Sequence, residues 1–277
     1  MAGPTPHVVA QLQHTHLEKL YGYLPGLPAA LPAVFGLSDE EYAEVRAGFD
    51  ARAWEAALEL LDDVDVARRV ARLPFRRGSR VLAVGDSITD DLLSWAQMLR
   101  YLLALARPED EIEVVNAGLS GHTTAMVLRR WPSMIDPAPD WILCGLGGND
   151  VTRVAGGKPQ VTTGESVANL RELRRIAAER TAARLVWLTP VPVDEDLAAA
   201  SPAFRYGASS WRNADVVALA AAVGSLGEPV VDLVTAVGVP LRPGLQGPDG
   251  VHPSVAGQQR ILTAVLETLT EEPVGGV

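Results

Sequence analysis

Ser87 is the residue of this sequence best placed to act as a nucleophile. The apolar run 81–84 and the Gly85 that follows it predict a buried strand of a parallel sheet, ending in a sharp turn. Polar residues typical of a helix start come next, and an apolar repeat extends the predicted helix from Ser87 through Leu103. We therefore expect Ser87 at a strand-to-helix junction on the carboxyl edge of the sheet, where ligands bind in open α/β folds.

Two histidines are candidates for the base that a serine nucleophile requires. His252 stands in a predicted turn with Asp249 three residues before it, so an orienting carboxylate would be close to the imidazole. His122 follows Gly121 after the second predicted strand, and no acidic residue lies near it in the sequence. Either histidine could take the proton of Ser87, but only His252 has a local acidic partner.

Glycine-rich or polar clusters also follow other predicted strands, at 116–121 and 147–150. Because the carboxyl ends of parallel strands meet at one edge of a sheet, these clusters should lie beside Ser87 and the 249–253 turn. The N–H of Gly121 could approach a substrate oxygen closely, since glycine has no side chain. Each such donor in a dry site supplies about 2.7–4 kcal/mol of transition-state stabilisation.

Short apolar segments alternate with helical patterns over residues 79–277 and predict the fold of this part of the chain. Strands separated by helices imply right-handed crossovers. We therefore predict one α/β domain, a three-layer α/β/α sandwich with a five-stranded parallel sheet. The predicted strands are 81–85, 111–116, 140–146, 184–189 and 229–233.

Residues 1–78 precede this domain and predict an N-terminal helical extension of two or three amphipathic helices. Ser38 and Glu41 have the spacing of a capping box, and Asp50 favours a second helix start. We expect the extension to pack on the sheet domain. His14 and His16 are not interpreted as a metal pair, because residues two apart on a helix point in different directions.

Composition and charge indicate which binding partners and which cellular location to expect. A net charge of −10 argues against nucleic acid as a partner, and no apolar stretch is long enough for a transmembrane segment. The N-terminal sequence lacks the pattern of a secretory signal, so a cytoplasmic location is expected. The single cysteine, Cys144, lies in an apolar run and is expected to be a buried thiol. No metal-ligand spacing is present, and we expect neither a metal nor another cofactor.

The motifs at positions 85–89 (GDSIT), 116–121 (NAGLSG), 147–150 (GGND) and 249–253 (DGVHP) together resemble the SGNH (GDSL-type) serine hydrolase/lipase superfamily. The resemblance covers about 80–270 and implies a flavodoxin-like sheet and an ester hydrolase that forms a covalent acyl-enzyme. It departs from the family at Asp90 and Asp91, where a less charged residue is common, and the extension has no counterpart in the minimal family core. By motif position the resemblance assigns Ser87 as nucleophile, His252 as base, Asp249 as its orienting partner, and the N–H groups of Ser87 and Gly121 with the Asn149 amide as an oxyanion hole.

Two alternatives use the same residues differently. An acyltransferase or thioesterase would form the same acyl-enzyme from a small-molecule acyl donor, and a non-catalytic module would only bind such a molecule. The connection after the fourth predicted strand is longer than usual for an α/β turn and carries Phe204 and Trp211. We expect it to overhang Ser87, with Phe204 either lining an acyl pocket or anchoring the loop.

Overall fold

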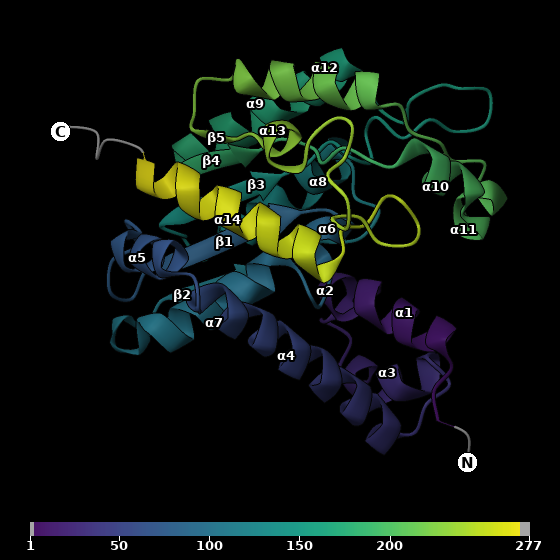
Figure 1. Cartoon of the computed structure of the whole chain (residues 1–277), viewed down its shortest axis with the longest axis horizontal. Helices are drawn as coiled ribbons and strands as arrows, with labels where there is room; N and C mark the ends of the chain where they lie inside the picture. The colour runs from purple at the N-terminus through teal and green to yellow at the C-terminus, as the bar shows by residue number, and fades with distance from the viewer. Residues whose placement is uncertain (1–2, 272–277) are drawn as a thin grey trace.

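Five parallel strands form the central sheet in the order β2-β1-β3-β4-β5 (Figure 1). The computed structural model describes residues 3–271. The predicted α/β fold is confirmed, although the second to fifth strands are each shorter than predicted. The strands are β1 (Arg80–Gly85), β2 (Glu113–Asn116), β3 (Trp141–Gly145), β4 (Arg184–Leu188) and β5 (Val230–Val231).

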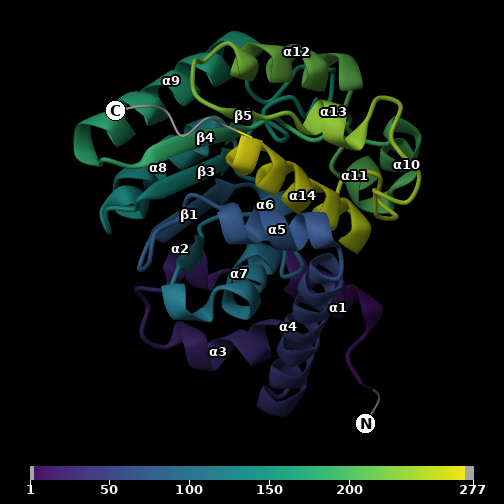
Figure 2. The same cartoon turned by 60° about the vertical axis from the view of Figure 1, so that its left-hand side comes forward.

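Helices cover both faces of the sheet and give it three layers (Figure 2). Alternate strand residues point to opposite faces. Val81 and Ala83 therefore pack in one buried cluster, while Leu82 and Val84 pack in another. Cys144 of β3 is buried in the second cluster, as expected. The first cluster lies under α5 (Val64–Arg72), α7 (Trp95–Ala106), α13 (Leu233–Val237) and α14 (Val255–Glu271), and the second lies under α8 (Thr124–Ile135), α9 (Thr163–Arg180) and α12 (Asn213–Gly224).

The predicted helix from Ser87 through Leu103 is wrong as a single element. It consists of α6 (Ser87–Asp90), a short non-helical segment, and α7. The Asp91 carboxylate accepts from the Leu93 N–H at 2.7 Å, and the Ser94 hydroxyl caps α7 by accepting from the Gln97 N–H at 3.3 Å. These side chains offer the backbone an alternative to helix and so break the apolar repeat.

Close backbone approach fixes the end of β1 against its neighbours. A Cβ at Gly85 would lie 2.1 Å from Thr89 Oγ1, and one at Gly118 would lie 2.7 Å from the Asp90 nitrogen. Only glycine allows α6 to sit between the end of β1 and the loop after β2. Ser87 is therefore held directly beside the 116–121 loop.

The N-terminal extension contains five helices, more than the two or three that were predicted. The capping box is confirmed, because the Ser38 N–H donates to Glu41 and the Glu41 N–H donates to Ser38 Oγ. The helix start predicted at Asp50 is wrong: its carboxylate instead accepts from Tyr101 Oη at 2.5 Å, so it faces α7 and caps nothing. The helices are α1 (Pro6–His14), α2 (Glu18–Tyr21), α3 (Leu27–Val34), α4 (Asp39–Leu61) and α5.

The extension packs on the sheet domain, as expected, and part of it enters the core. Val66 and Val70 of α5 lie in the same buried cluster as Val81, while Phe49 and Ala53 of α4 pack with Leu93. Figure 1 shows α1 and α2 near the end of the sheet where α6 lies. The extension therefore reaches the carboxyl edge that carries Ser87.

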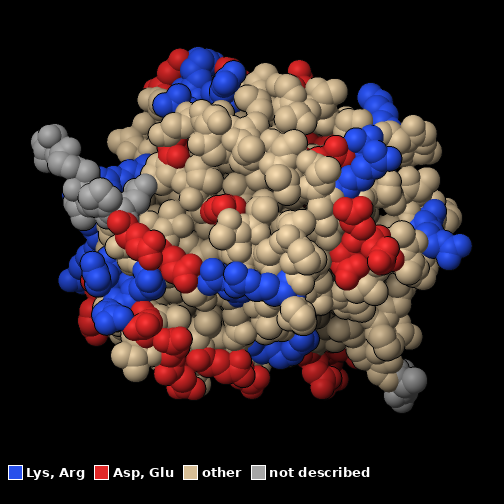
Figure 3. All heavy atoms as spheres, turned by 45° about the horizontal axis from the view of Figure 1, so that its top comes forward, with Lys and Arg blue, Asp and Glu red and all other residues tan. Residues whose placement is uncertain are grey.

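Two further observations concern the surface and the membrane. On the face shown in Figure 3, acidic and basic side chains are interspersed around the rim, and acidic residues follow the lower edge. Within residues 3–271, no helix combines the length and the apolar character needed to cross a membrane.

Candidate active site

Ser87, His252 and Asp249 lie in one hydrogen-bonded line at the carboxyl edge of the sheet. His252 Nε2 is 2.9 Å from Ser87 Oγ, and His252 Nδ1 is 2.5 Å from Asp249 Oδ2. The other carboxylate oxygen of Asp249 accepts from the N–H groups of Val251 and His252, both at 2.9 Å. The turn therefore fixes the carboxylate, the carboxylate orients the imidazole, and the imidazole faces the hydroxyl.

The electrostatics of the turn favour a charged pair between Asp249 and His252. Burial alone would raise the pKa of Asp249, but the hydrogen bond and charge of His252 outweigh it and lower that pKa to about 2. Burial alone would lower the pKa of His252, but its hydrogen bond to Asp249 and the charge of Asp249 leave it raised above 6.5. An imidazole with a raised pKa is a stronger base toward the Ser87 hydroxyl.

The helix that carries Ser87 is held from two sides. The Asp86 side chain accepts from the Ile88 N–H at 3.1 Å, and burial raises the pKa of Asp86 to about 6. From α14, Gln258 donates to the Ile88 carbonyl at 3.0 Å and accepts from the Trp95 N–H at 2.9 Å. The junction is thereby fixed to the C-terminal helix as well as to the sheet.

Three donors could point at an oxyanion bound beside Ser87. The N–H of Ser87 is the first of α6 and has no acceptor within that helix. Gly121 has φ 78°, while its neighbours Ser120 and His122 donate to Asp90 and to the Leu119 carbonyl. The positive φ of Gly121 is a backbone conformation that favours glycine.

Asn149 supplies the third donor from the loop after β3. Its side-chain nitrogen donates to the His122 carbonyl at 3.1 Å, which links this loop to the 116–121 segment. An amide nitrogen carries two hydrogens, so one remains for a substrate. The structure thus brings the predicted site residues Ser87, Gly121, Asn149, Asp249 and His252 to one edge, and their roles stay predictions.

The alternative base, His122, stands elsewhere in the hydrogen-bond network. Its backbone carbonyl holds Asn149, and its Nδ1 is buried without a hydrogen-bond partner among the described residues. Burial lowers the pKa of His122, and the charge of Arg130 lowers it further. His252 is the histidine that contacts Ser87.

Asp150 belongs to the same motif as Asn149 and does a different task. It accepts from the N–H of Thr124 at 3.0 Å and from the hydroxyls of Thr124 and Ser166 at 2.5 and 2.8 Å. These contacts tie the start of α8 to the start of α9 behind the loop. Within residues 3–271, no group of three or more His, Cys, Asp or Glu side chains is arranged to hold a metal ion.

A small cavity of about 20 Å³ opens beside Ser87. Trp211 closes one side of it, with its ring nitrogen 3.3 Å from the Gly148 carbonyl. The cavity is mostly apolar, and its polar lining residues are Asp86, Ser87 and Asn149. Its lining includes Ile88, Val191, Val193, Val216 and Val251.

The long connection after β4 contains two short helices, α10 (Glu195–Ala200) and α11 (Pro202–Tyr206). It overhangs the site: the ring centroid of Phe204 is 4.7 Å from that of Trp211 and 6.5 Å from that of His252. Phe204 is not among the residues that line the cavity beside Ser87. It therefore packs behind Trp211 and beside the imidazole.

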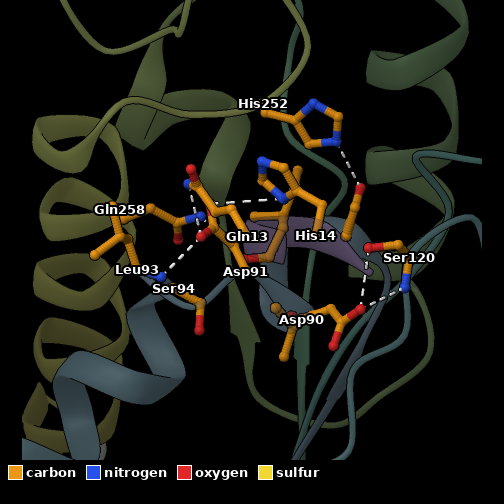
Figure 4. A network of polar contacts seen from close by, with 12 residues as sticks. Gln13, His14, Asp90, Asp91, Leu93, Ser94, Ser120, His252 and Gln258 are labelled. Atoms are coloured by element: carbon orange, nitrogen blue, oxygen red, sulfur yellow. Dashed lines mark hydrogen bonds and ion pairs between the residues drawn. The ribbon is translucent and has the colours of Figure 1, made fainter. Parts of the chain in front are cut away.

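A group of polar residues from the extension, which was not predicted from the sequence, also reaches this edge; Figure 4 shows two of them, Gln13 and His14. They come from the end of α1, from the connection between α1 and α2, and from α2, and they contact Asp90 and Asp91, three and four residues after Ser87. The signal that could have found them is the pair of aspartates itself, because buried carboxylates in an apolar segment need partners. The residues are Gln13, His14, His16 and Lys19.

Proteins of known family are similar to this chain in sequence. Residues 83–260 match the GDSL-like Lipase/Acylhydrolase family, and the match includes all five site residues. Esterase TesA of Pseudomonas aeruginosa is 27% identical over 195 residues, which cover 68% of this chain and 87% of that protein. An acetylxylan esterase of Geobacillus stearothermophilus is 34% identical over 91 residues, but these cover only 27% of this chain and 42% of that protein.

Solved structures agree with the sequence matches. The structure of Axe2, an acetylxylan esterase from Geobacillus stearothermophilus, matches with a TM-score of 0.55 at 26% identity, covering 72% of this chain and 98% of Axe2. LAE5, an alpha/beta hydrolase enzyme from the metagenome of Lake Arreo, shares the fold with a TM-score of 0.55 at 23% identity, covering 70% and 96% of the two chains. The chain therefore belongs to the GDSL-like lipase/acylhydrolase family, within the SGNH hydrolases, and is an enzyme that hydrolyses ester bonds.

Proposed function

We propose that this enzyme cleaves carboxylic esters of short acyl chains through a covalent acyl-enzyme on Ser87. The observation that carries the proposal is the line from Ser87 through His252 to Asp249, with contacts of 2.9 and 2.5 Å. A hydroxyl, a base and a carboxylate in this order are the parts that activate a serine.

The proposed reaction has two halves. His252 Nε2 takes the proton of Ser87 as Oγ attacks the ester carbonyl carbon, and the carbonyl oxygen becomes an oxyanion facing the Ser87 and Gly121 N–H groups and the Asn149 amide. When the tetrahedral species collapses, His252 gives its proton to the departing alkoxide, which leaves the acyl group on Ser87. Water then gives a proton to His252, attacks the acyl carbon, and releases the acid as the proton returns to Ser87.

The size of the cavity supports a short acyl chain. A volume of about 20 Å³ is close to what one water-sized group requires. The methyl of an acetyl ester would fit between Trp211 and Val216, whereas the methylenes of a long chain would exceed the volume of this cavity. The similarity to acetylxylan esterases is in line with this preference.

A serine-reactive probe and a graded ester series test the proposal. A fluorophosphonate should label the wild-type protein and should not label Ser87→Ala, while Ser225→Ala, an exposed serine after α12, serves as the control. Among p-nitrophenyl esters, kcat/KM should be highest for acetate and should fall as the chain lengthens. Labelling of Ser87→Ala at the wild-type rate, or a preference for long chains, would contradict the proposal.

The same acyl-enzyme could also react with another acceptor. Acyl-thioesters in the series and an added alcohol acceptor distinguish a thioesterase or an acyltransferase from an ester hydrolase by the product formed. A protein that binds the esters without turnover or labelling would be a binding module instead. A cytoplasmic location and the lack of a nucleic-acid partner stay predictions, which fractionation and a binding assay can test.

A further inference from the structure

The imidazole of His252 has a second imidazole stacked on it. The ring centroid of His14 lies 4.7 Å from that of His252, with 29° between the ring planes. Figure 4 shows His14 reaching from the end of α1 into the space between Asp91 and His252. Phe204 approaches His252 at 6.5 Å and is tilted by 34°, so it gives a looser contact.

The end of α1 is fixed so that this stack has little freedom. The side-chain amide of Gln13 donates to both carboxylate oxygens of Asp91, at 2.9 and 3.0 Å. The backbone carbonyl of Gln13 accepts from the Leu92 N–H at 3.2 Å. His14 is therefore held against the segment that directly follows the helix of Ser87.

A second anchor lies just beyond His14. His16 Nδ1 is 2.7 Å from Asp90 Oδ1, and both side chains are buried. The other oxygen of Asp90 accepts from the N–H and hydroxyl of Ser120, at 2.9 and 3.0 Å. The extension is thus attached both to the nucleophile's helix and to the loop that carries Gly121.

The imidazole of His14 is suited to stack on His252 as an uncharged ring. Burial, together with the neighbouring charge of His252, lowers its pKa to about 4. Its Nδ1 is buried without a hydrogen-bond partner among the described residues and lies 3.9 Å from Asp91 Oδ2. A neutral ring does not compete with His252 for Asp249, and its face can accommodate the charge that His252 gains during the reaction.

We propose that His14 is a positioning residue that holds the His252 ring in the plane joining Ser87 to Asp249. The proposal deepens the function proposed above and rests on it. The stack leaves both ring nitrogens of His252 in their hydrogen bonds, and it covers one face of the imidazole from water. The minimal SGNH core would lack this contact, because His14 belongs to the extension.

Two variants of His14 separate positioning from space filling. His14→Ala removes the ring, so kcat should fall up to about 100-fold, the loss that a misplacement of about 1 Å can cause. KM should change little, because the ester is held by the acyl pocket. His14→Phe keeps an aromatic ring at the stack and should stay close to the wild-type kcat. His7→Ala, an exposed histidine of the same helix, is the matched control.

The pH profile supplies a readout that loss of packing elsewhere would not move. Removing His14 exposes one face of His252 to water, so burial lowers its pKa less and the pKa of His252 should rise. The acid limb of kcat/KM should then shift to higher pH in His14→Ala and not in His14→Phe. The titratable groups that act on this pair, besides each other, are Asp86, Asp90, Asp91, Asp249 and His16.

An NMR titration of the His252 ring makes the same comparison without substrate. If the wild-type protein hydrolyses no ester and takes no fluorophosphonate, the proposed function fails, while the ring titration still tests the stack. An unchanged kcat and an unchanged His252 pKa in His14→Ala would overturn the positioning role. Equal losses in His14→Ala and His14→Phe would overturn it as well, and so would a lower melting temperature with an unmoved acid limb.

Discussion

Lys19 of α2, which is half-buried, forms an ion pair with the buried carboxylate of Asp90 in α6, with 2.5 Å between Nζ and Oδ1. The amine of Lys19 also donates to the Gly118 carbonyl at 3.0 Å and to Asn116 Oδ1 at 3.3 Å. One cation from the extension therefore joins the helix of the nucleophile to the loop of an oxyanion donor. The charged residues that depart from the family pattern are the ones that bind the extension.

The first prediction concerns the stability contributed by this ion pair. Lys19→Met removes one charged partner of the buried Asp90 carboxylate, which keeps His16 and Ser120, so the free energy of unfolding should fall by about 1.5–3 kcal/mol. Urea denaturation measures it. Arg68→Met is the control, because Arg68 pairs with Asp65 on the surface, where their side chains are 63% and 71% exposed. Equal effects of the two substitutions would contradict this role of Lys19.

The second prediction separates the two candidate bases. His252→Ala should lower kcat by several orders of magnitude, as expected when a serine loses its base. His122→Ala should change kcat modestly, because the contact to Asn149 is made by a backbone carbonyl that alanine retains. Steady-state kinetics on a p-nitrophenyl ester measures both variants. A larger loss in His122→Ala would reverse the assignment of the base.

The third prediction concerns pH. Because the folded-state pKa of His252 is raised above 6.5, the protonated form stabilises the fold below pH 6.5. This stabilisation is lost as the pH rises through the raised pKa, whereas kcat/KM increases over the same range because the base must be neutral. As the pH rises through this range, the denaturation midpoint should therefore fall while kcat/KM rises. His252→Gln should remove its share of the stability change, and an unaltered slope would contradict the assignment.

The fourth prediction concerns the acyl pocket. Phe204→Ala removes the ring that packs at 4.7 Å on Trp211, a wall of the cavity beside Ser87. The ratio of kcat/KM for short against long esters should change by roughly 1–3 kcal/mol, or 10–200-fold at most. Val216→Ala, which enlarges the cavity directly, should shift the ratio toward longer chains. A uniform loss across all esters with a lower melting temperature would show that Phe204 only anchors the connection.

The fifth prediction concerns metal ions. In the proposed reaction, His252 carries every proton transfer, and protein N–H groups meet the developing negative charge, so no step requires a cation. Ester hydrolysis should therefore survive dialysis against EDTA. A chelator-sensitive rate that zinc restores would mean that aspartates near Ser87, such as Asp86 and Asp150, serve as ligands.

The sheet could be predicted from the sequence because strands and turns are recognised from residues that are close together in the chain. Strand runs, glycine turns and capping residues are read within a few positions, and the DGVHP turn keeps Asp249 beside His252. The break after α6 was missed because the apolar repeat continues across it, while the Asp91 and Ser94 side chains that cause it give the weaker signal. Local chemistry overrode periodicity there.

The contacts of the extension could not be predicted in the same way. His16 and Asp90 are 74 residues apart in sequence, and nothing in either local pattern names the other as its partner. The pair Asp90 and Asp91 indicates that buried carboxylates need partners, but the sequence does not show which of its basic and amide side chains supply them. Only the path of α1 and α2 over the carboxyl edge selects Gln13, His14, His16 and Lys19.

The stack of His14 on His252 joins two segments that lie far apart in the sequence, on either side of Ser87. Contacts between residues so far apart in sequence require large loops to close before they form, which makes them late events in folding. Ester hydrolysis is therefore a reporter of completed folding. A refolding chain should recover its helical signal first and its turnover last, and a nascent chain would carry its nucleophile for most of synthesis before the base arrives.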